Sequence, residues 1–249
     1  MSESNIQTQA QINSAQKPLA FVTGGSRGLG LESAKGLINA GYRVVLVAKN
    51  QSLLEKVAAE LGAGFVAVDL ADLDATRRTF ESLVTQYGTP EVLMLAHGVM
   101  SEKMSKTLRA TTEEWRRVMT VNLDATFVIV NTVVPSMAEV RKGRVIIYSA
   151  CLGRMSGPGN AGGLAPYRIS KAGVNALVRN LAHETGLGAR GVLVDAICPN
   201  HSRTDMGGPD APRSAAEGAE TAVWLALRDF TPGVDQTGVL WEDRNVIPW

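Results

Sequence analysis

Tyr167 and Lys171 are the pair of residues in this sequence whose types and spacing most directly suggest chemistry. They stand four residues apart in YRISK, at the start of a stretch of helical period, so both side chains share one face of a helix. A phenol has a pKa near 10, and a nearby ammonium lowers that pKa by favouring the phenolate. The pair is therefore a candidate proton donor with its tuning group, although Y-x-x-x-K also arises by accident in amphipathic helices.

A glycine-rich turn, TGGSRGLG from Thr23 to Gly30, predicts a phosphate-binding site. Its glycines let the chain turn tightly and let a pyrophosphate approach the N-terminus of the helix that follows, where unpaired amides favour negative charge. The spacing is not G-x-G-x-x-G, so the turn alone is also compatible with simple turn chemistry. The candidate cofactor-binding residues in this turn are Gly24, Ser26, Arg27, Gly28, Leu29 and Gly30.

The end of the second apolar run favours NADP(H) over NAD(H). Folds that bind NAD place an acidic residue there for the ribose 2′-hydroxyl, whereas this run ends in Ala48, Lys49 and Asn50. Lys49 and Arg27 put two cations where a 2′-phosphate would sit, unless both are simply solvated surface charges. Asp69, followed by Leu70, closes the third run and could accept from an adenine amino group or cap the next helix.

Apolar runs and helical stretches alternate along the chain and indicate the elements that position these groups. Strands that read as continuous Val, Ile and Leu, separated by helices, predict a parallel sheet covered on both faces. We expect a single-domain, doubly wound α/β fold of the Rossmann type with about seven strands. The expected strands begin at Leu19, Arg43, Gly64, Glu91, Gly143, Gly191 and Gly238, and the helical stretches follow Gly30 or begin at Ser52, Ala75, Thr111 and Tyr167.

Composition limits the partners. The chain has 249 residues, a net charge of +1 and no long basic run, so nothing indicates nucleic-acid binding. It has no run of 18 apolar residues and no lipidation motif, which argues against a membrane span or anchor. Two cysteines without a CxxC motif or a signal peptide favour a reducing, cytoplasmic location. The three histidines lack metal-ligand spacing, so no metal site is expected.

Two segments differ from the rest of the chain. Residues 1–17 are rich in Gln, Ser and Asn and are expected to be a disordered tail, which leaves 18–249 as the NADP-binding domain. Residues 200–213 are polar and irregular, and could form a mobile flap over a site.

Taken together, TGGSRGLG, Asp69, VNLDATF, RVIIYS, YRISK and the end VIPW resemble the short-chain dehydrogenase/reductase family, most of all its carbonyl-reductase-like members. The resemblance covers Pro18 to Trp249. It implies hydride transfer from NADPH to a carbonyl, with Tyr167 as proton donor, Lys171 holding the ribose and Asn122 anchoring a proton relay. It also implies cofactor contacts at the strand ends, from Asn50, Leu70, Ala96, Gly98, Pro199 and Thr204 as well as from Tyr167 and Lys171.

The sequence departs from the family pattern at three places. LAHG at residues 95–98 replaces N-N-A-G and brings His97 beside the expected cofactor, and Pro199-Asn200 replaces P-G. The family serine that binds the substrate carbonyl aligns with Ala150, and neighbouring Ser149 should point to the opposite face of the strand. Cys151, Arg154, Ser156 or Asn160 could replace the missing donor only weakly or if their loop folds back, and that loop is longer than usual.

Three functions remain open at this point. The first is an NADPH-dependent reductase of a small carbonyl or imine substrate, slowed by Ala150 or carrying it as a serine-to-alanine variant. The second keeps NADP(H) but performs a non-redox step such as cyclisation, elimination or isomerisation, using His97. The third is a non-catalytic nucleotide-sensing protein. The resemblance also implies a homodimer or homotetramer, which the apolar stretches VIVNTVV and AGVNALV would allow.

Overall fold

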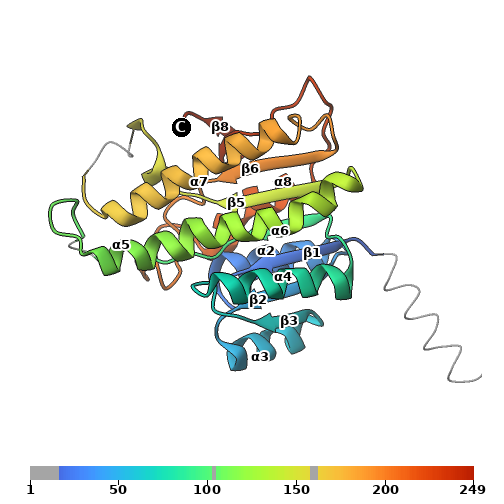
Figure 1. Ribbon diagram of the computed structural model, residues 1–249, viewed down its shortest axis with the longest axis horizontal. Coiled ribbons are helices and arrows are strands. Elements are labelled where there is room, and N and C mark those ends of the chain that lie inside the picture. Colours follow the sequence, from blue (N-terminus) through green and yellow to red (C-terminus); the bar gives the residue numbers. More distant parts are fainter. Residues whose placement is uncertain (1–16, 103–104, 158–161) are drawn as a thin grey trace, which may run out of the picture.

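A computed structural model describes residues 17–102, 105–157 and 162–249, so the expected tail lies almost wholly outside the described residues. One sheet of eight strands, in the order β3-β2-β1-β4-β5-β6-β7-β8, forms the centre of the molecule (Figure 1). Its strands are β1 (Leu19–Thr23), β2 (Arg43–Ala48), β3 (Gly64–Ala67), β4 (Val92–Leu95), β5 (Gly143–Tyr148), β6 (Val192–Ile197), β7 (Leu240–Glu242) and β8 (Asn245–Ile247).

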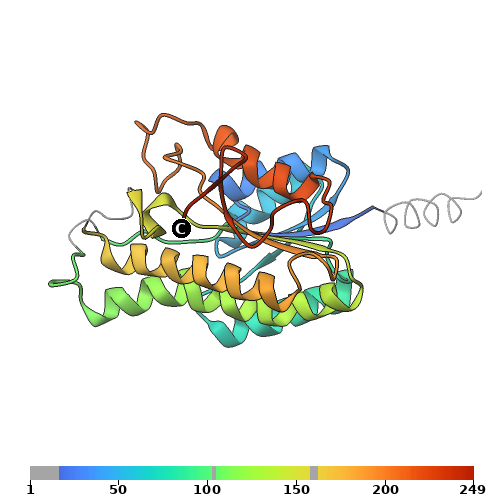
Figure 2. The same cartoon turned by 90° about the horizontal axis from the view of Figure 1, so that it is seen from above.

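Helices cover both faces of this sheet, as Figure 2 shows. Those on one face are α2 (Gly28–Asn39), α3 (Gln51–Leu61) and α8 (Ala215–Leu227). Those on the other are α4 (Leu73–Tyr87), α5 (Thr112–Met119), α6 (Ala125–Glu139) and α7 (Ala165–Glu184). The doubly wound Rossmann-type fold is therefore confirmed.

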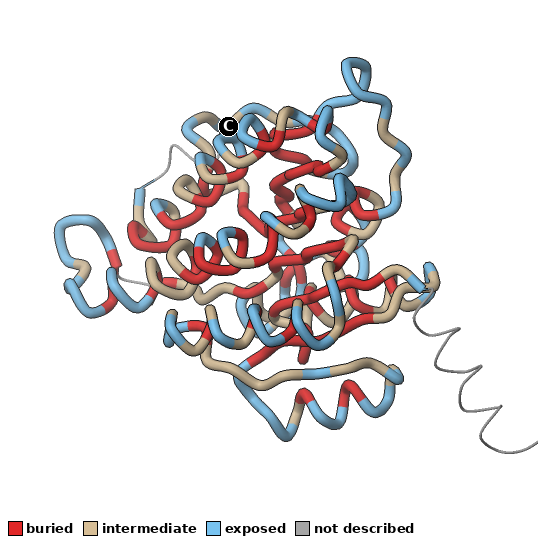
Figure 3. Tube along the Cα trace, turned by 45° about the vertical axis from the view of Figure 1, so that its right-hand side comes forward, coloured by how far each residue is buried: buried red, intermediate tan, exposed pale blue. Residues whose placement is uncertain are grey.

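Side chains of β1 alternate between the two layers of the core. Phe21 packs with the layer of α4, α6 and α7, whereas Ala20 and Val22 pack with α2, α3 and α8. Figure 3 shows that buried residues follow the strands and the inward helix faces. A core on both faces fixes the strand ends, and so the loops that carry the candidate site, within one rigid frame.

The sheet has one strand more than the seven that were expected, and the additional strand is β8. All seven predicted strands exist and run parallel, but the chain then turns back so that β8 pairs antiparallel with β7. The turn residues Asp243 and Arg244 both have positive φ, at 50° and 61°. Two-residue hairpin turns usually contain glycine or asparagine, and the turn Asp243-Arg244 contains neither.

The helix predicted from Thr111 is continuous but not uniform. Between α5 and α6 lies one π-helical turn, η1 (Thr120–Asp124), and the whole span runs from Thr112 to Glu139. Its length and mean hydropathy of 1.4 would suffice for a membrane span, but 50% of that window is buried inside the fold. Its apolar character is that of a helix covering a parallel sheet.

Candidate functional site

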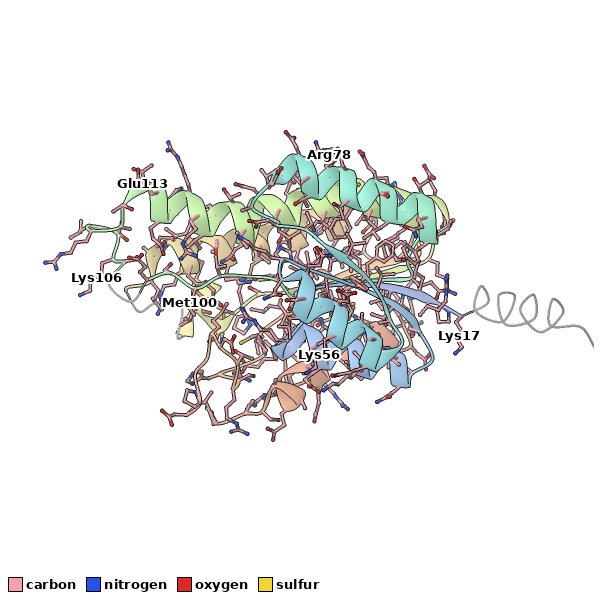
Figure 4. The ribbon with its side chains drawn as sticks, turned by 90° about the horizontal axis from the view of Figure 1, so that it is seen from below. Lys17, Lys56, Arg78, Met100, Lys106 and Glu113 are labelled. Atoms are coloured by element: carbon pink, nitrogen blue, oxygen red, sulfur yellow. The ribbon has the colours of Figure 1, made fainter. Side chains whose placement is uncertain are left out.

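Eight of the predicted site residues line a cavity of about 410 Å³ at the carboxyl ends of the strands, and the others lie outside its lining. Met100, which lines this cavity, lies at the end of the molecule opposite Lys17, where the chain enters β1 (Figure 4). Parallel strands bring their carboxyl ends to one edge, where open α/β sheets bind ligands. The predicted residues that line the cavity are Leu29, Ala96, Gly98, Ala150, Tyr167, Lys171, Pro199 and Thr204.

Tyr167 and Lys171 lie on the buried face of α7 with 5% and 4% of their surface exposed. The main-chain N–H of Tyr167 donates to Ser101 Oγ at 2.8 Å, which fixes the first turn of the helix. Lys171 Nζ donates to the main-chain oxygen of Tyr148 at 2.7 Å and lies 5.9 Å from the centre of the Tyr167 ring. The structure thus places a phenol and an ammonium side by side at the cavity wall.

The expected lowering of the Tyr167 pKa is wrong for the protein alone. Burial raises that pKa above its ordinary value, and the nearby thiols of Cys198 and Cys151 raise it further. Burial also lowers the pKa of Lys171 to about 8, because an ammonium loses hydration inside the protein. The phenol therefore holds its proton at neutral pH, and Lys171 is the group that titrates near the physiological range.

The glycine turn forms a cradle that side chains would fill. Gly24 has φ of +66°, and a Cβ there would lie 2.9 Å from the main-chain oxygen of Ala96. At Gly30 a Cβ would lie 2.3 Å from the oxygen of Gly24, so any other residue would push α2 away from the turn. Arg27 precedes α2 without capping it through its side chain, and the first turn holds no acidic residue. An uncapped helix N-terminus behind a bare turn fits a pyrophosphate.

Two ion pairs flank this cradle. Arg27 Nη1 lies 2.5 Å from Asp205 Oδ2, and Lys49 Nζ lies 2.6 Å from Asp69 Oδ2. Both cations remain largely exposed, at 68% and 75% of their side chains. Such surface pairs contribute only about 0–1 kcal/mol, so a phosphate could draw either cation away at little cost.

Asp69 does not cap the helix that follows it. Asp72 does so, because its side chain accepts from the N–H of Ala75. Asp69 instead accepts from the N–H of Ala71, and the hydrogen bond from Lys49 lowers its pKa. The carboxylate stays charged at the edge of the sheet.

Three neighbouring candidates are held in ordinary structural roles. Asn50 caps α3 by accepting from the N–H of Leu53 at 3.0 Å, and Leu70 packs in the core. Ser26 is buried within the glycine turn. Their contribution to cofactor binding remains a prediction.

Asn122 lies in the π-helical turn rather than in a regular α-helix. Its Oδ1 accepts from Val99 N at 2.7 Å, and its Nδ2 donates to Val99 O at 3.0 Å and to Ser170 Oγ at 3.0 Å. A Cβ at Gly98 would lie 3.4 Å from Asn122 Oδ1 and 3.5 Å from Lys171 Nζ. Asn122 therefore ties the segment after β4 to α7, and glycine keeps the space between Asn122 and Lys171 open.

Ala150, which aligns with the family serine, lines the cavity. It packs with Tyr167 and Val118 in a small apolar cluster beside the cavity. Ser149 also borders the cavity, but its hydroxyl donates to Asn175 Oδ1 of α7 at 2.5 Å. That Ser149 is a poor substitute for the family serine stays a prediction, although the bond to Asn175 engages its hydroxyl.

The described part of the loop after Ala150 packs against α7 and the carboxyl end of the chain. A single 3-10 turn, η2 (Cys151–Gly153), packs against α7, where a Cβ at Gly153 would lie 2.7 Å from the main chain of Lys171. Arg154 Nε then donates to Pro248 O and Ser156 Oγ to Trp249 O. Both side chains bind the carboxyl end of the chain, and Asn160 lies outside the described residues.

His97 is held on both sides by threonine hydroxyls. Its Nδ1 lies 2.7 Å from Thr23 Oγ1, and its Nε2 lies 3.2 Å from Thr126 Oγ1. Thr126 donates its own proton to the main-chain oxygen of Asn122, so it accepts from Nε2–H and Thr23 donates to Nδ1. Burial, together with the nearby charge of Lys171, lowers the pKa of His97 to about 3. His97 is a neutral ring with both nitrogens bonded.

Asn200 adopts the backbone conformation that explains the loss of the family glycine. Its φ is +57°, a left-handed conformation that asparagine tolerates better than other residues with a side chain. The following segment closes on itself, because Arg203 N donates to Arg213 O at 2.7 Å and Ser202 bridges to Arg213. His201, Thr204 and Met206 are among the cavity-lining residues of the expected flap.

Sequence analysis missed one pair of residues at the cavity. Cys151 and Cys198 both line it, although they are far apart in the chain, and the N–H of Cys151 donates to Cys198 Sγ at 3.1 Å. They meet because they follow the neighbouring strands β5 and β6, a pairing that sequence spacing does not reveal.

Comparisons with known sequences show the same family. A family described as short chain dehydrogenase matches residues 18–214. A 3-oxoacyl-[acyl-carrier-protein] reductase FabG of Staphylococcus aureus is 31% identical over 193 residues, which cover 75% of each chain. The corresponding protein of Pseudomonas aeruginosa is 32% identical over 213 residues, 82% of this chain and 83% of its own.

Solved structures show the same fold. A short chain dehydrogenase from Shigella flexneri, complexed with NADP, superposes with a TM-score of 0.78 at 21% identity, over 90% of this chain and 95% of its own. Another from Escherichia coli, complexed with NADPH, gives 0.79 at 20% identity, over 92% and 98% of the two chains.

Proposed function

This chain belongs to the short-chain dehydrogenase family of oxidoreductases, and we propose that it reduces a carbonyl or imine group of a small organic substrate with NADPH. The single observation that carries the proposal is the burial of Tyr167 beside Lys171 at the cavity wall. Relatives named as 3-oxoacyl-[acyl-carrier-protein] reductases, and solved relatives complexed with NADP or NADPH, support the same direction.

The residues divide the work as follows. The backbone of the glycine turn and the N-terminus of α2 would hold the pyrophosphate, and Arg27 and Lys49 the 2′-phosphate. NADPH supplies the hydride when bound. Tyr167 donates a proton to the substrate oxygen, and Lys171, anchored on Tyr148 O, keeps positive charge beside that proton. A charge near the developing oxyanion acts strongly in a buried site.

Ala150 leaves the substrate oxygen without the usual second donor. Removing one such donor costs on the order of 100- to 1000-fold in turnover, a loss that a large total acceleration can absorb. We therefore propose a working but slow reductase, or one whose substrate fills the space that the serine would occupy.

His97 gives no support to the non-redox alternative. An acid or base in the cavity needs a free nitrogen and a pKa near the working pH. His97 has both nitrogens bonded to threonines and a pKa lowered to about 3. The reductase is the function that the geometry favours.

Stoichiometry tests the proposal. We expect one NADPH oxidised per alcohol or amine formed when the protein is given a panel of small ketones, aldehydes, imines and 3-oxoacyl thioesters. Conversion of a substrate without NADPH consumption would contradict the proposal in favour of non-redox chemistry, and NADPH binding without turnover of any carbonyl would favour a sensing role.

We also propose that two copies of the chain associate through α6 and α7. An apolar groove between these helices is lined by Val130, Leu177 and Leu181 among others, and Phe127 at its edge is 51% exposed. Its apolar surface fits a second copy of the same helices better than solvent. Light scattering should report a dimer or tetramer, and Phe127→Glu should shift it towards the monomer.

A further inference from the structure

We propose that Cys151 and Cys198 form an oxidisable dithiol at the wall of the cavity, which a hydroperoxide converts to a disulfide. The inference concerns a covalent modification of the site and does not require the chain to be a reductase. It stands on the position of the two thiols, on the unequal exposure of their side chains and on the hydrogen bonding between them.

The pairing of β5 with β6 brings Cys151 and Cys198 together. β5 and β6 run parallel and in register up to Tyr148 and Ile197, and the N–H of Ser149 continues that ladder to Ile197 O. Cys198 follows β6 directly, and the N–H of Cys151 reaches its sulfur at 3.1 Å. The two thiols also form a side-chain hydrogen bond with each other, so their sulfurs are direct neighbours.

Exposure divides the pair into an attacking and a resolving thiol. Cys198 is buried with 2% of its surface exposed, whereas Cys151 is partly exposed at the cavity. Sensor cysteines in general are accessible and stand next to a second cysteine that resolves the first product. Cys151 has the position of the former and Cys198 that of the latter.

A hydrogen bond between the two thiols favours the thiolate on Cys151. A hydrogen bond from the Cys198 thiol lowers the pKa of Cys151, and the charge of Arg154 lowers it further, against burial and the carboxylate of Glu242. The pKa of Cys198 is raised by the same hydrogen bond and by burial. A thiolate is the nucleophile in such oxidations, so the more accessible sulfur is also the more reactive one.

The chemistry balances with hydrogen peroxide as the oxidant. The Cys151 thiolate attacks one peroxide oxygen, the O–O bond breaks, and sulfenic acid and hydroxide form. The Cys198 thiol then attacks the sulfenic sulfur, the S–O bond breaks, and the disulfide and water form. The two cysteines lose two electrons, and two water molecules are the net products once the hydroxide takes up a proton.

The bond would tie η2 to the end of β6 beside the reaction site. Both sulfurs lie close enough to Tyr167 for their charge to raise its pKa, and Ala150 precedes Cys151 directly. On the proposed function, oxidation should slow carbonyl reduction by roughly tenfold or more, since small displacements of a reacting site are costly. A reductant should restore the rate.

Intact mass is the direct test, because the chain has only two cysteines. Treatment with hydrogen peroxide should remove two hydrogens, and dithiothreitol should return them. Trypsin without reduction should release Val145–Arg154 joined to Gly191–Arg203, the peptides that carry the two thiols. A non-reducing gel should show the same proportion of monomeric chains as a reducing one.

Single variants identify the attacking thiol. In Cys198→Ala, peroxide should leave a sulfenic acid on Cys151 that dimedone traps. In Cys151→Ala, the buried Cys198 should stay a free thiol under the same treatment. Two free thiols after oxidation of the unaltered chain, a cross-link between chains, or equal trapping in both variants would overturn the proposal. Absence of any reductase activity before oxidation would contradict the proposed function and leave the mass result to decide the dithiol.

Discussion

Lys171 of α7 and Tyr148 of β5 are joined by a hydrogen bond of 2.7 Å from the lysine ammonium to the main-chain oxygen. The bond holds the ammonium at the carboxyl end of β5, beside the Tyr167 ring and below the space that Gly98 leaves open. Burial lowers the pKa of this lysine to about 8, so its charge changes just above neutral pH.

The rate of carbonyl reduction should therefore begin to fall at a pH below the pKa of an ordinary lysine. Lys171 carries its charge below about pH 8 and loses it above, while the raised pKa of Tyr167 keeps the phenol protonated through this range. We expect kcat/KM to fall about tenfold per pH unit above pH 8. Steady-state rates from pH 6 to 10, with circular dichroism as a control for folding, check this, and a flat profile to pH 10 contradicts it.

Ala150→Ser should accelerate reduction. The new hydroxyl would lie beside Tyr167, in the cluster where Ala150 now packs, and would donate to the same substrate oxygen. We expect a gain of roughly ten- to a thousand-fold in kcat with little change in NADPH affinity, because such a bond strengthens as negative charge develops. Ser149→Ala is the matched control. The Ser149 hydroxyl is bonded to Asn175, so this substitution should give no comparable gain in kcat. No gain from Ala150→Ser would mean that the space serves the substrate.

Cofactor preference should depend on Lys49 and Arg27. We expect the unaltered chain to bind NADPH at least tenfold more tightly than NADH, a difference of about 1.4 kcal/mol. Replacing both cations with alanine should remove most of that preference and leave NADH affinity nearly unchanged. Lys56→Ala, on the exposed face of α3, is the control for a general loss of charge (Figure 4). Equal affinities of the unaltered chain for the two nucleotides would contradict the assignment.

His97 should make the fold sensitive to mild acid. Its folded pKa is lowered to about 3, so below the ordinary value near 6.5 the unfolded chain binds a proton that the folded chain does not. The free energy of unfolding should then fall as pH falls, by up to about 1.4 kcal/mol per unit from this group. Urea unfolding at pH 7 and pH 5 checks this. His97→Gln should reduce the difference in unfolding free energy between pH 7 and pH 5. His183→Gln, on the exposed side of α7, should leave that difference unchanged.

The fold could be predicted because its determinants are local. Seven apolar runs, five helical stretches and the glycine turn are each recognisable from consecutive residues, and parallel pairing then brings their carboxyl ends together. The helix α8 was not among the expected stretches. The strand β8 was missed because Asp243 and Arg244 adopt positive φ without the usual turn residues.

The electrostatics of the site could not be predicted from residue types. Sequence spacing placed Lys171 beside Tyr167 correctly, but the sign of the tyrosine pKa shift depends on burial and on two thiols from other strands. The neutral state of His97 likewise depends on its burial and on the charge of Lys171, which no sequence pattern links to it. Long-range contacts of this kind appear only when the sheet is assembled.

The most direct measurement of the central claim compares Tyr167→Phe with the unaltered chain in two assays, NADPH binding and NADPH-dependent carbonyl reduction. The substitution removes only the hydroxyl and keeps the buried ring, so we expect the NADPH dissociation constant to stay within about threefold while kcat falls at least 100-fold, as loss of a proton donor predicts. Tyr87→Phe on α4, remote from the cavity, should change neither value. Turnover of Tyr167→Phe at the unaltered rate would contradict the assignment of Tyr167 as proton donor.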